Sequence, residues 1–163
     1  MKKGDVRGVS PNVATIILVI IILVIALIVF LWIRGLIGES IIKFDGRSVE
    51  RACETVDFSV SYSEGNLAVI NNGDIPIYDL NVKVVRRGSS ETDKFSEIFK
   101  GSSTPFDSTK LKMGGSFLGI LPEGYTTGAT SLIFTPILMG KGANSGTQKT
   151  SACNEKFAKT VKL

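Results

Sequence analysis

The sequence contains no histidine, and this absence removes several kinds of chemistry at once. Without an imidazole there is no Ser-His-Asp or Cys-His catalysis, because both arrangements need a base that titrates near neutral pH. The most common metal ligand and proton shuttle of proteins is missing for the same reason. The chain has only two cysteines, and two thiolates without histidine do not complete a tetrahedral metal site, so we expect no metal.

Motifs for phosphate, calcium and acid-base chemistry are missing as well. The Gly-rich stretch GKGANSG (140–146) has the wrong order for a phosphate-binding loop, which needs Gly-Lys followed by Ser or Thr before a helix. The segment NNGD (71–74) lacks the spaced acidic residues of a calcium loop. Carboxylates are spread singly along the chain. We interpret 140–146 as a flexible surface loop and 71–74 as a tight turn, and we expect neither an enzyme nor a bound cofactor.

Positive charge is present but dispersed. The formal net charge is +4, and pairs such as Arg86-Arg87 and Lys110/Lys112 are mixed with acidic residues. This pattern is typical of a solvated surface rather than of a nucleic-acid interface, so we expect no nucleic-acid partner.

The most prominent feature that is present is a long apolar run. Residues 13–33 include no charged residue, and as a helix they would extend about 32 Å, the hydrocarbon thickness of a bilayer. A cleaved secretory signal has an apolar run of about 7–15 residues and a small-x-small cleavage site. Here the run is longer, and the nearby candidate site at 38–40 is weak. The run therefore predicts a retained single-pass membrane segment.

The charges on either side of the run predict its orientation. Three basic residues precede it, at positions 2, 3 and 7, whereas only Arg34 and Lys43 follow closely. Basic residues stay preferentially on the cytoplasmic side, so we expect a cytoplasmic N-terminus and an external C-terminal domain.

The residues around the run indicate where the helix begins and ends. Ser10 can act as the N-cap, and Pro11 suits the first helical turn, where its missing N–H costs nothing. Apolar side chains then occupy every face, with Thr15 the lone polar residue, so the helix needs lipid or other apolar helices around it. Gly35 and Gly38 either bend the helix or form a plain linker, and the following ESIIKFDG could extend it by about two turns.

After residue 54 the spacing of apolar residues changes from helical to alternating. VDFSVSY (56–62) alternates apolar and polar residues, which is typical of a half-buried strand. LAVIN (67–71) and IYDLNVKVV (77–85) are predicted as further strands. Turns at 63–66 and 71–74 separate the three.

The later segments continue this pattern. DKFSEIF (93–99) fits either a short strand or one helical turn, and 101–115 is predicted as polar loop. SFLGIL (116–121), TSLIFTPIL (130–138) and FAKTVKL (157–163) are predicted as strands. Six or seven short strands without crossover helices predict an antiparallel β-sandwich of general immunoglobulin-like shape rather than a parallel α/β fold.

The predicted fold class is therefore α+β. A long hydrophobic helix occupies residues up to 45, and a sandwich domain occupies 46–163, which is long enough for one small domain with its own core.

The two cysteines are Cys53, near the start of the first predicted strand, and Cys153, just before the last. In an exported domain the simplest interpretation is a disulfide, which would close a loop around nearly the whole domain and contribute about 4–5 kcal/mol in the chain-entropy treatment. The alternative is two free buried thiols.

The residues RGVSP (7–11) come directly before the apolar run. Together, RGVSPNVATIILVIIILVIALIVFLW resembles the N-terminal segment of archaeal type IV pilins and related archaellin-like proteins, over about 25 of the 163 residues. This resemblance implies that a prepilin-type peptidase on the cytoplasmic side cuts between Gly8 and Val9. Residues 1–8 would then be a leader of the class III signal peptide kind, and the helix over 9–45 would be retained.

The resemblance also implies a use for the helix. It first anchors the subunit in the membrane and then packs against other copies in a helical filament, with the help of the pilus assembly machinery. Val13 stands where bacterial relatives carry glutamate, so assembly would depend on apolar packing rather than on charge pairing, and Asn12 replaces a more usual small or apolar residue. The residues expected in the filament core are Val13, Ile16, Ile17, Ile20, Leu23, Leu27, Phe30 and Leu31.

Two classes of function are compatible with these observations. The first is a structural subunit of a cell-surface filament, a homo-oligomer serving adhesion, or motility if it is archaellin-like. The second is an ordinary single-pass membrane protein whose sandwich binds a sugar, a peptide or another partner. An anchored enzyme is disfavoured because no catalytic group of residues is present.

Overall fold

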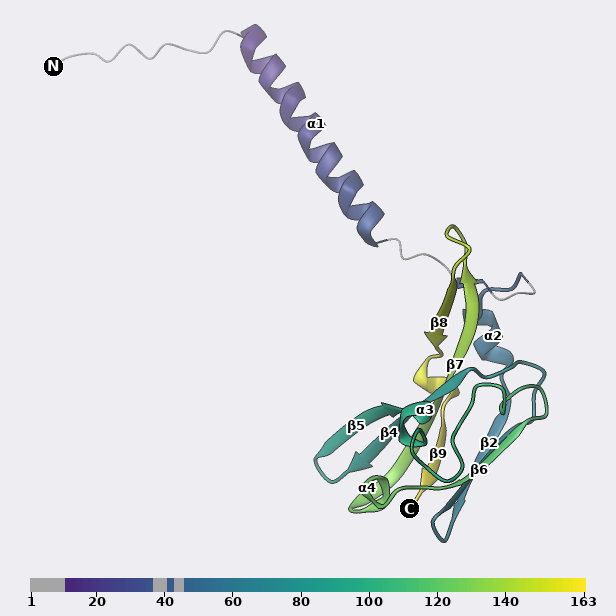
Figure 1. The fold of residues 1–163 in the computed structure, drawn as a ribbon. Coiled ribbons are helices and arrows are strands. Elements are labelled where there is room, and N and C mark those ends of the chain that lie inside the picture. The colour runs from purple at the N-terminus through teal and green to yellow at the C-terminus, as the bar shows by residue number, and fades with distance from the viewer. Residues whose placement is uncertain (1–10, 37–40, 43–45) are drawn as a thin grey trace, which may run out of the picture. The chain divides into compact units, whose positions relative to one another are not determined.

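The computed structural model describes residues 11–36, 41–42 and 46–163, and the chain divides into two compact units between positions 39 and 40 (Figure 1). The first unit contains one helix, α1 (Pro11–Leu36). The second is built mainly from antiparallel sheets. The α+β class predicted from the sequence is confirmed at this level, and the immunoglobulin-like arrangement stays a prediction.

Helix α1 begins at Pro11, in agreement with the suitability of proline for a first helical turn. Ser10, the predicted N-cap, and Gly38 lie outside the described residues. The predicted extension of the helix through ESIIKFDG is wrong, because Ile41–Ile42 forms the short strand β1 and pairs with Gly142 and Lys141. These two isoleucines find backbone partners on a sheet edge, and this outweighs any helical tendency of the segment.

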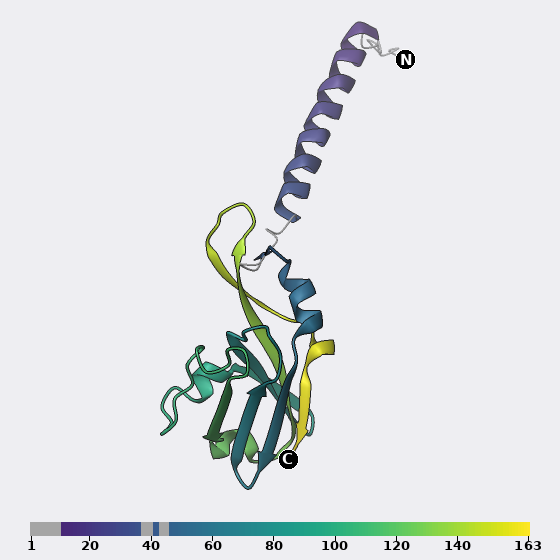
Figure 2. The same ribbon diagram turned by 90° about the vertical axis from the view of Figure 1, so that its right-hand side faces the viewer.

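Within the described residues, nine strands form two sheets in which every pairing is antiparallel. The larger sheet has the order β1-β7-β4-β5, with β8 and β9 also paired to β7, and the smaller has the order β2-β3-β6. The strands of the larger sheet are β1, β4 (Asp79–Arg86), β5 (Ser89–Lys94), β7 (Ala129–Gly142), β8 (Gln148–Ala152) and β9 (Lys159–Lys162). Those of the smaller sheet are β2 (Phe58–Ser63), β3 (Asn66–Asn71) and β6 (Ser116–Ile120). Figure 2 shows β2 and β9 side by side where the two sheets meet.

Short helices connect the strands. They are α2 (Val49–Thr55), α3 (Phe95–Ile98), α4 (Glu123–Thr126) and the 3-10 turn η1 (Glu155–Phe157). Helix α2 carries Cys53, which therefore lies in a helix before β2 and not near the start of a strand as the sequence predicts. Ser48 caps α2 by accepting a hydrogen bond from the Arg51 N–H, and the buried residues of the helix lie on one face, so helical spacing persists up to the first strand.

Several strands follow the predicted alternation and others do not. The predictions at 56–62, 67–71 and 77–85 correspond to β2, β3 and β4, whose inward-facing apolar positions are buried or half-buried, whereas Ile70 of β3 is exposed. Besides β1, two strands were missed, β5 with the sequence SSETDK and β8 with QKTSA. Both are mostly exposed and lack an apolar face, so they form through pairing with β4 and β7 rather than through a hydrophobic pattern.

The structure corrects the interpretation of residues 140–146 and selects one of the two alternatives for residues 93–99. The stretch 140–146 is not simply a loop, because residues 140–142 extend β7, where 140 and 141 pair with β8, and only the remainder turns. Of the two possibilities for 93–99, the helical turn is the one formed, as α3.

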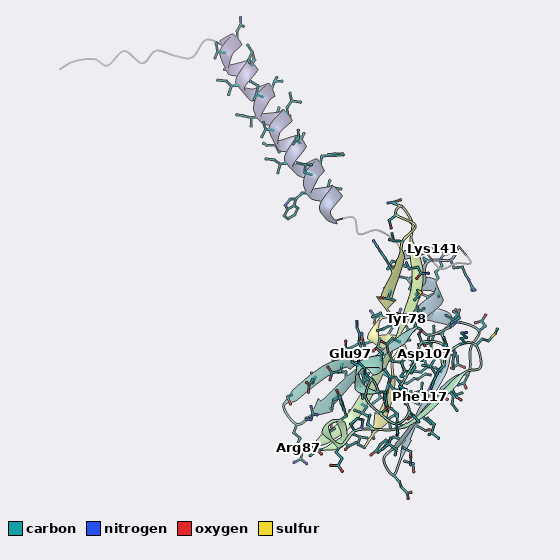
Figure 3. All side chains as sticks on the ribbon, viewed as in Figure 1. Tyr78, Arg87, Glu97, Asp107, Phe117 and Lys141 are labelled. Carbon is teal, nitrogen blue, oxygen red and sulfur yellow. A yellow bond between two sulfur atoms is a disulfide. The ribbon has the colours of Figure 1, made fainter. Side chains whose placement is uncertain are left out.

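The core lies between the two sheets and is centred on phenylalanine. Phe95 is fully buried, and its ring centroid lies 4.7 Å from that of Phe99, 4.9 Å from Phe106 and 5.1 Å from Phe117. Edge-to-face arrangements of this kind add to the burial of apolar area. Phe117 is labelled among the interior side chains in Figure 3. The rings join β6, α3 and the loop that follows α3.

Asn71 is a buried polar residue that organises two loops. Its amide Nδ2 donates to the carbonyl oxygens of Ile75 at 2.8 Å, Leu111 at 3.0 Å and Lys112 at 3.1 Å, and its Oδ1 accepts from the Gly73 N–H at 3.1 Å. Where the sequence predicts a tight turn at 71–74, the chain bends at 73–75 after the end of β3, and Asn71 holds both this bend and the long loop after α3. Among the described residues, no buried side-chain nitrogen or oxygen lacks a hydrogen-bond partner.

The disulfide Cys53–Cys153 joins α2 to the C-terminal segment, with a Cα–Cα distance of 5.6 Å and a sequence separation of 100 residues. The pairing expected from the sequence is therefore present, and the alternative of two free thiols is not.

Replacing both cysteines by serine is expected to lower the free energy of unfolding by about 4–5 kcal/mol, because the unfolded chain regains the freedom of a long loop. Guanidinium denaturation followed by circular dichroism measures this. Reducing the wild-type disulfide in the same assay should give a similar loss, which separates the cross-link from the serine side chains. A shift below about 1 kcal/mol in both experiments contradicts the assignment.

Asn71→Asp is expected to cost about 3 kcal/mol at pH 7, because a carboxylate replaces the amide that donates to three carbonyl oxygens. Burial beside those carbonyls raises the pKa of the new carboxyl above its unfolded value. Part of the lost stability therefore returns as the pH falls through the raised pKa, because the protonated carboxyl donates one hydrogen bond. Denaturation at pH 7 and pH 4 tests this. The exposed neighbour provides a control, since Asn72→Asp should change stability by no more than about 0.5 kcal/mol.

Candidate functional site: the apolar helix

Helix α1 is the part of the chain whose surface is apolar and exposed on every side. Over Asn12–Ile33, 22 residues, the mean hydropathy reaches 3.8 and none of the surface is buried inside the chain. The exposed fractions of its large apolar side chains run from 47% at Val13 to 73% at Trp32. By length and composition this helix could span a membrane. Figure 3 shows the side chains projecting on every side of it.

The residues predicted for the filament core are all on this surface. Val13, Ile16, Ile17, Ile20, Leu23, Leu27, Phe30 and Leu31 are each exposed. Residues on the other side of the helix, such as Leu18, Ile22 and Val29, are equally apolar and are also exposed. The helix therefore selects no single face for packing, and an environment that covers it must be apolar all round.

The polar groups of the helix are satisfied internally. The Thr15 hydroxyl, the lone polar side chain of the run, donates to the Asn12 carbonyl oxygen at 2.9 Å. Helical backbone groups also pair within the segment, which is the condition for a chain in hydrocarbon. Thr15 therefore adds little to the cost of leaving water.

Trp32 lies near the C-terminal end of the apolar span and is the only tryptophan of the chain. Tryptophan is enriched where hydrocarbon meets the polar head-group region, because its ring is apolar and its N–H needs a partner. In the sequence Arg34 follows two positions later. This order is typical of a helix leaving a membrane.

Gly8 and Val9, the predicted leader-cleavage residues, lie outside the described residues.

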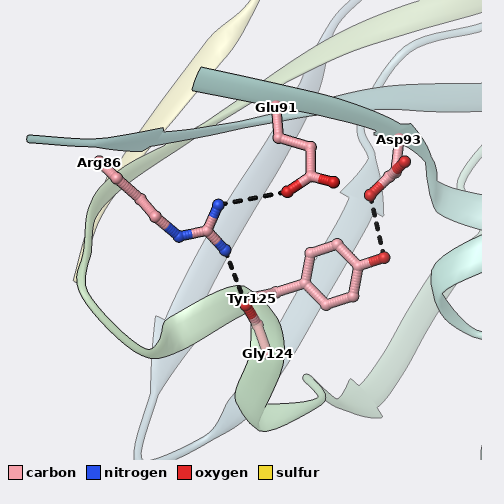
Figure 4. Close-up of polar contacts among 5 residues, drawn as sticks. All are labelled: Arg86, Glu91, Asp93, Gly124 and Tyr125. Atoms are coloured by element: carbon pink, nitrogen blue, oxygen red, sulfur yellow. Dashed lines mark hydrogen bonds and ion pairs between the residues drawn. The ribbon is translucent and has the colours of Figure 1, made fainter. Parts of the chain in front are cut away.

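The β domain, taken by itself, has a polar cluster that fastens α4 to β5 (Figure 4). The Tyr125 hydroxyl donates to Asp93 Oδ2 at 3.0 Å, and Arg86 donates to the Gly124 carbonyl oxygen at 2.7 Å and to Glu91 Oε2 at 3.3 Å. Burial raises the pKa of Tyr125, and the hydrogen bond to Asp93 and the charge of that carboxylate raise it further. A neutral phenol held by a carboxylate in this way is a structural contact.

The buried carboxylate of Asp79 is also used structurally. Asp79 accepts hydrogen bonds from the backbone N–H of Leu80 at 2.8 Å and of Ser96 at 3.1 Å, and from the Ser96 hydroxyl at 2.6 Å. It thereby positions the first turn of α3. Asp107 is exposed, and a backbone N–H from Thr109 lowers its pKa. Among the described residues no group of three or more acidic or cysteine side chains could hold a metal ion.

Sequence reasoning missed Asn71, Asp79 and Tyr125 as organising residues. A signal existed only for Asn71, in the NNGD turn. The other two depend on partners 17 and 32 positions away in the chain, which no local pattern predicts.

Asp93→Ala is expected to lower the pKa of Tyr125, since it removes the hydrogen-bond acceptor and the charge while burial of the phenol remains. The phenolate absorbance difference between each protein and its Tyr125→Phe version isolates this residue. A raised folded pKa means that the stability contributed by the phenol is present below about pH 10 and is lost as the pH rises through the folded value. An unchanged titration in Asp93→Ala contradicts the contact.

The fluorescence of Trp32 should report how deep its indole ring lies in a bilayer. In full-length protein reconstituted into phospholipid vesicles, we expect a tryptophan emission wavelength between that of indole in water and that of indole in hydrocarbon. A quencher attached to the lipid head group should reduce this emission more than a quencher at the bilayer centre. Phe30→Trp in a Trp32→Phe background moves the probe about 3 Å along the helix axis and should be quenched from a deeper position. Emission equal to that of free indole in water contradicts a membrane role.

No protein-family model, no curated protein and no solved structure matches this chain. Its function is therefore inferred from its own residues.

Proposed function

We propose that this chain is a structural subunit of an extracellular type IV pilus-like filament, which is assembled by packing of α1 from many copies and serves adhesion to surfaces. The observation that carries the proposal is α1 itself, an uncharged span of 22 residues with no part buried inside the chain. The RGVSP sequence before it, which resembles the N-terminus of archaeal type IV pilins, is the feature that favours a filament over a permanent anchor.

The apolar surface of α1 can be removed from water in two successive environments, first a bilayer and then a filament. Each large apolar side chain moved out of water contributes about 1.5–3 kcal/mol, and the helix has side chains of this kind on all faces. A bilayer satisfies this requirement for a single subunit. In a filament, neighbouring helices replace lipid, and the gain comes from close packing, because lipid tails are as apolar as leucine.

Removal of the leader fits this exchange. Residues 1–8 contain three basic residues and one acid, so cleavage after Gly8 lowers the formal net charge from +4 to +2. An uncleaved chain would bring these charges to the end of a helix that has to enter an apolar core, where unpaired charge is costly.

The β domain supports an external location for the rest of the chain. A disulfide persists in oxidising compartments and is rare in the cytosol. The polar clusters of this domain form hydrogen bonds within the domain. The role that we infer for the β domain is therefore to form a stable outer part of each subunit.

Gly8→Val tests the proposal. It is expected to leave the leader on the chain, since the peptidase by analogy needs a small residue at the cut, and to abolish filaments while the protein stays in the membrane. Gly4→Val, in the same leader, is the matched control and should be processed normally. Terminal mass analysis reads the cleavage, and electron microscopy of sheared cell-surface material reads the filaments.

The competing function, a single-pass anchored β domain that binds a partner, gives the opposite results. It predicts wild-type protein that still begins at Met1 or Lys2 and detergent extracts that contain only monomers. Assembled fibres made of chains that retain the leader would also count against the proposed mechanism.

A further inference from the structure

The open edges of the β domain differ in how they are protected against pairing with other chains. Edge strands expose unpaired backbone groups, and proteins commonly protect them with charge or by covering them. β5, at the end of the larger sheet, contains Glu91, Asp93 and Lys94. β2 lies beside β9. β6, with the sequence SFLGI, has neither protection.

The register of β6 shows which of its backbone groups are free. Asn71 N donates to the Gly115 carbonyl oxygen and Leu121 N to the Gly65 carbonyl oxygen, both at 2.9 Å. Antiparallel pairs alternate between hydrogen-bonded and non-hydrogen-bonded positions, so Phe117 and Gly119 bond to β3. The N–H and C=O groups of positions 116, 118 and 120 therefore point away from β3, and within the described part of the chain no strand pairs with that side.

The outer face next to this edge carries no charge. Leu118 and Ile120 are 64% and 65% exposed, and Ile70 on β3 is 43% exposed. The other positions on this face are small or polar and uncharged. They are Ser59, Ser61, Ser63, Asn66, Ala68 and Ser116.

A contact through this edge is small. Five residues of strand extend about 17 Å, and the patch covers roughly 300 Å², well below the roughly 800 Å² per partner of a stable standard interface. The occupant must therefore already be held close by. The chain supplies such a tether, because α1 could span a membrane and would concentrate copies of the β domain at one surface.

We propose that β6 pairs antiparallel with β6 of a second copy of this chain. Centred on Leu118, the pairing places Leu118 opposite its counterpart and Ser116 opposite Ile120 of the second copy. The free groups at positions 116, 118 and 120 then satisfy one another, with up to about six backbone hydrogen bonds. No charged side chains are brought together, so the cross-strand repulsion that usually blocks such pairing is absent.

This contact has a consequence that goes beyond the proposed filament. The same strand is used on both sides, so the pairing closes after two copies and cannot propagate a polar helical stack. It joins subunits in pairs in the membrane, or two filaments side by side. The proposal requires only that copies share a membrane, so it can be tested where no filament forms.

The test uses the full chain in phosphatidylcholine vesicles that hold several copies each. Leu118→Cys is treated with a short bismaleimide, and the cross-linked dimer is measured on a denaturing gel; the native cysteines are engaged in the disulfide and do not react. Thr92→Cys, exposed on the charged edge strand β5, is the matched control. We expect at least about fivefold more dimer from Leu118→Cys, because only that edge is self-complementary.

Two further variants locate the contact. In the Leu118→Cys background, Ile120→Lys should reduce the dimer about fivefold, since it places charge in the paired edge. Ile70→Lys, on the same face but one strand away from the edge, should leave the yield unchanged. A mixture of Ser116→Cys and Ile120→Cys chains, which keep Leu118, should cross-link between the two positions.

Equal yields from Leu118→Cys and Thr92→Cys overturn the proposal. An equal loss from Ile70→Lys and Ile120→Lys also overturns it, because the sheets would then be stacking face to face. If wild-type chains still begin at Met1 or Lys2 and form no filaments, while Leu118→Cys cross-links strongly, the proposed function is rejected and this contact stands.

Discussion

The constraint on which the rest of the chain depends is that α1 cannot remain in water. Its side chains are apolar on every face, its single internal hydroxyl bonds to its own backbone, and no part of it is buried within the chain. Whatever surrounds it has to be lipid or other apolar helices. This one requirement separates the chain into a part that needs partners and a part that folds around its own core.

The β domain meets the opposite condition. Its phenylalanine cluster fills the space between two sheets, Asn71 and Asp79 have their hydrogen bonds satisfied, and a disulfide ties α2 to the C-terminal segment. The buried polar groups hold loops and short helices in place. A domain of this kind suits a durable external role, and its contacts with neighbours have to come from its surface.

At that surface the charge distribution matters more than the total charge. The two sheets end in edge strands of opposite character: β5 carries three charges in six residues, whereas β6 carries none in five. Both strands are short, so neither edge can hold two molecules together alone. The proposed anchoring by α1 would change this balance, because a weak contact becomes effective when the copies are already confined to one membrane or one assembly.

The sequence by itself determined the elements whose pattern is local. An uncharged run of 21 residues specifies a helix such as α1, and alternating apolar residues specify β2, β3 and β4, because burial repeats with the period of the backbone. Two cysteines in a chain expected to be exported were enough to predict their disulfide. Tertiary structure decided what depends on distant partners: the polar strands β5 and β8 exist only through pairing, and Tyr125 finds Asp93 across 32 positions. The open edge of β6 is also a tertiary property, since only the order of strands in the sheet decides which backbone groups remain free.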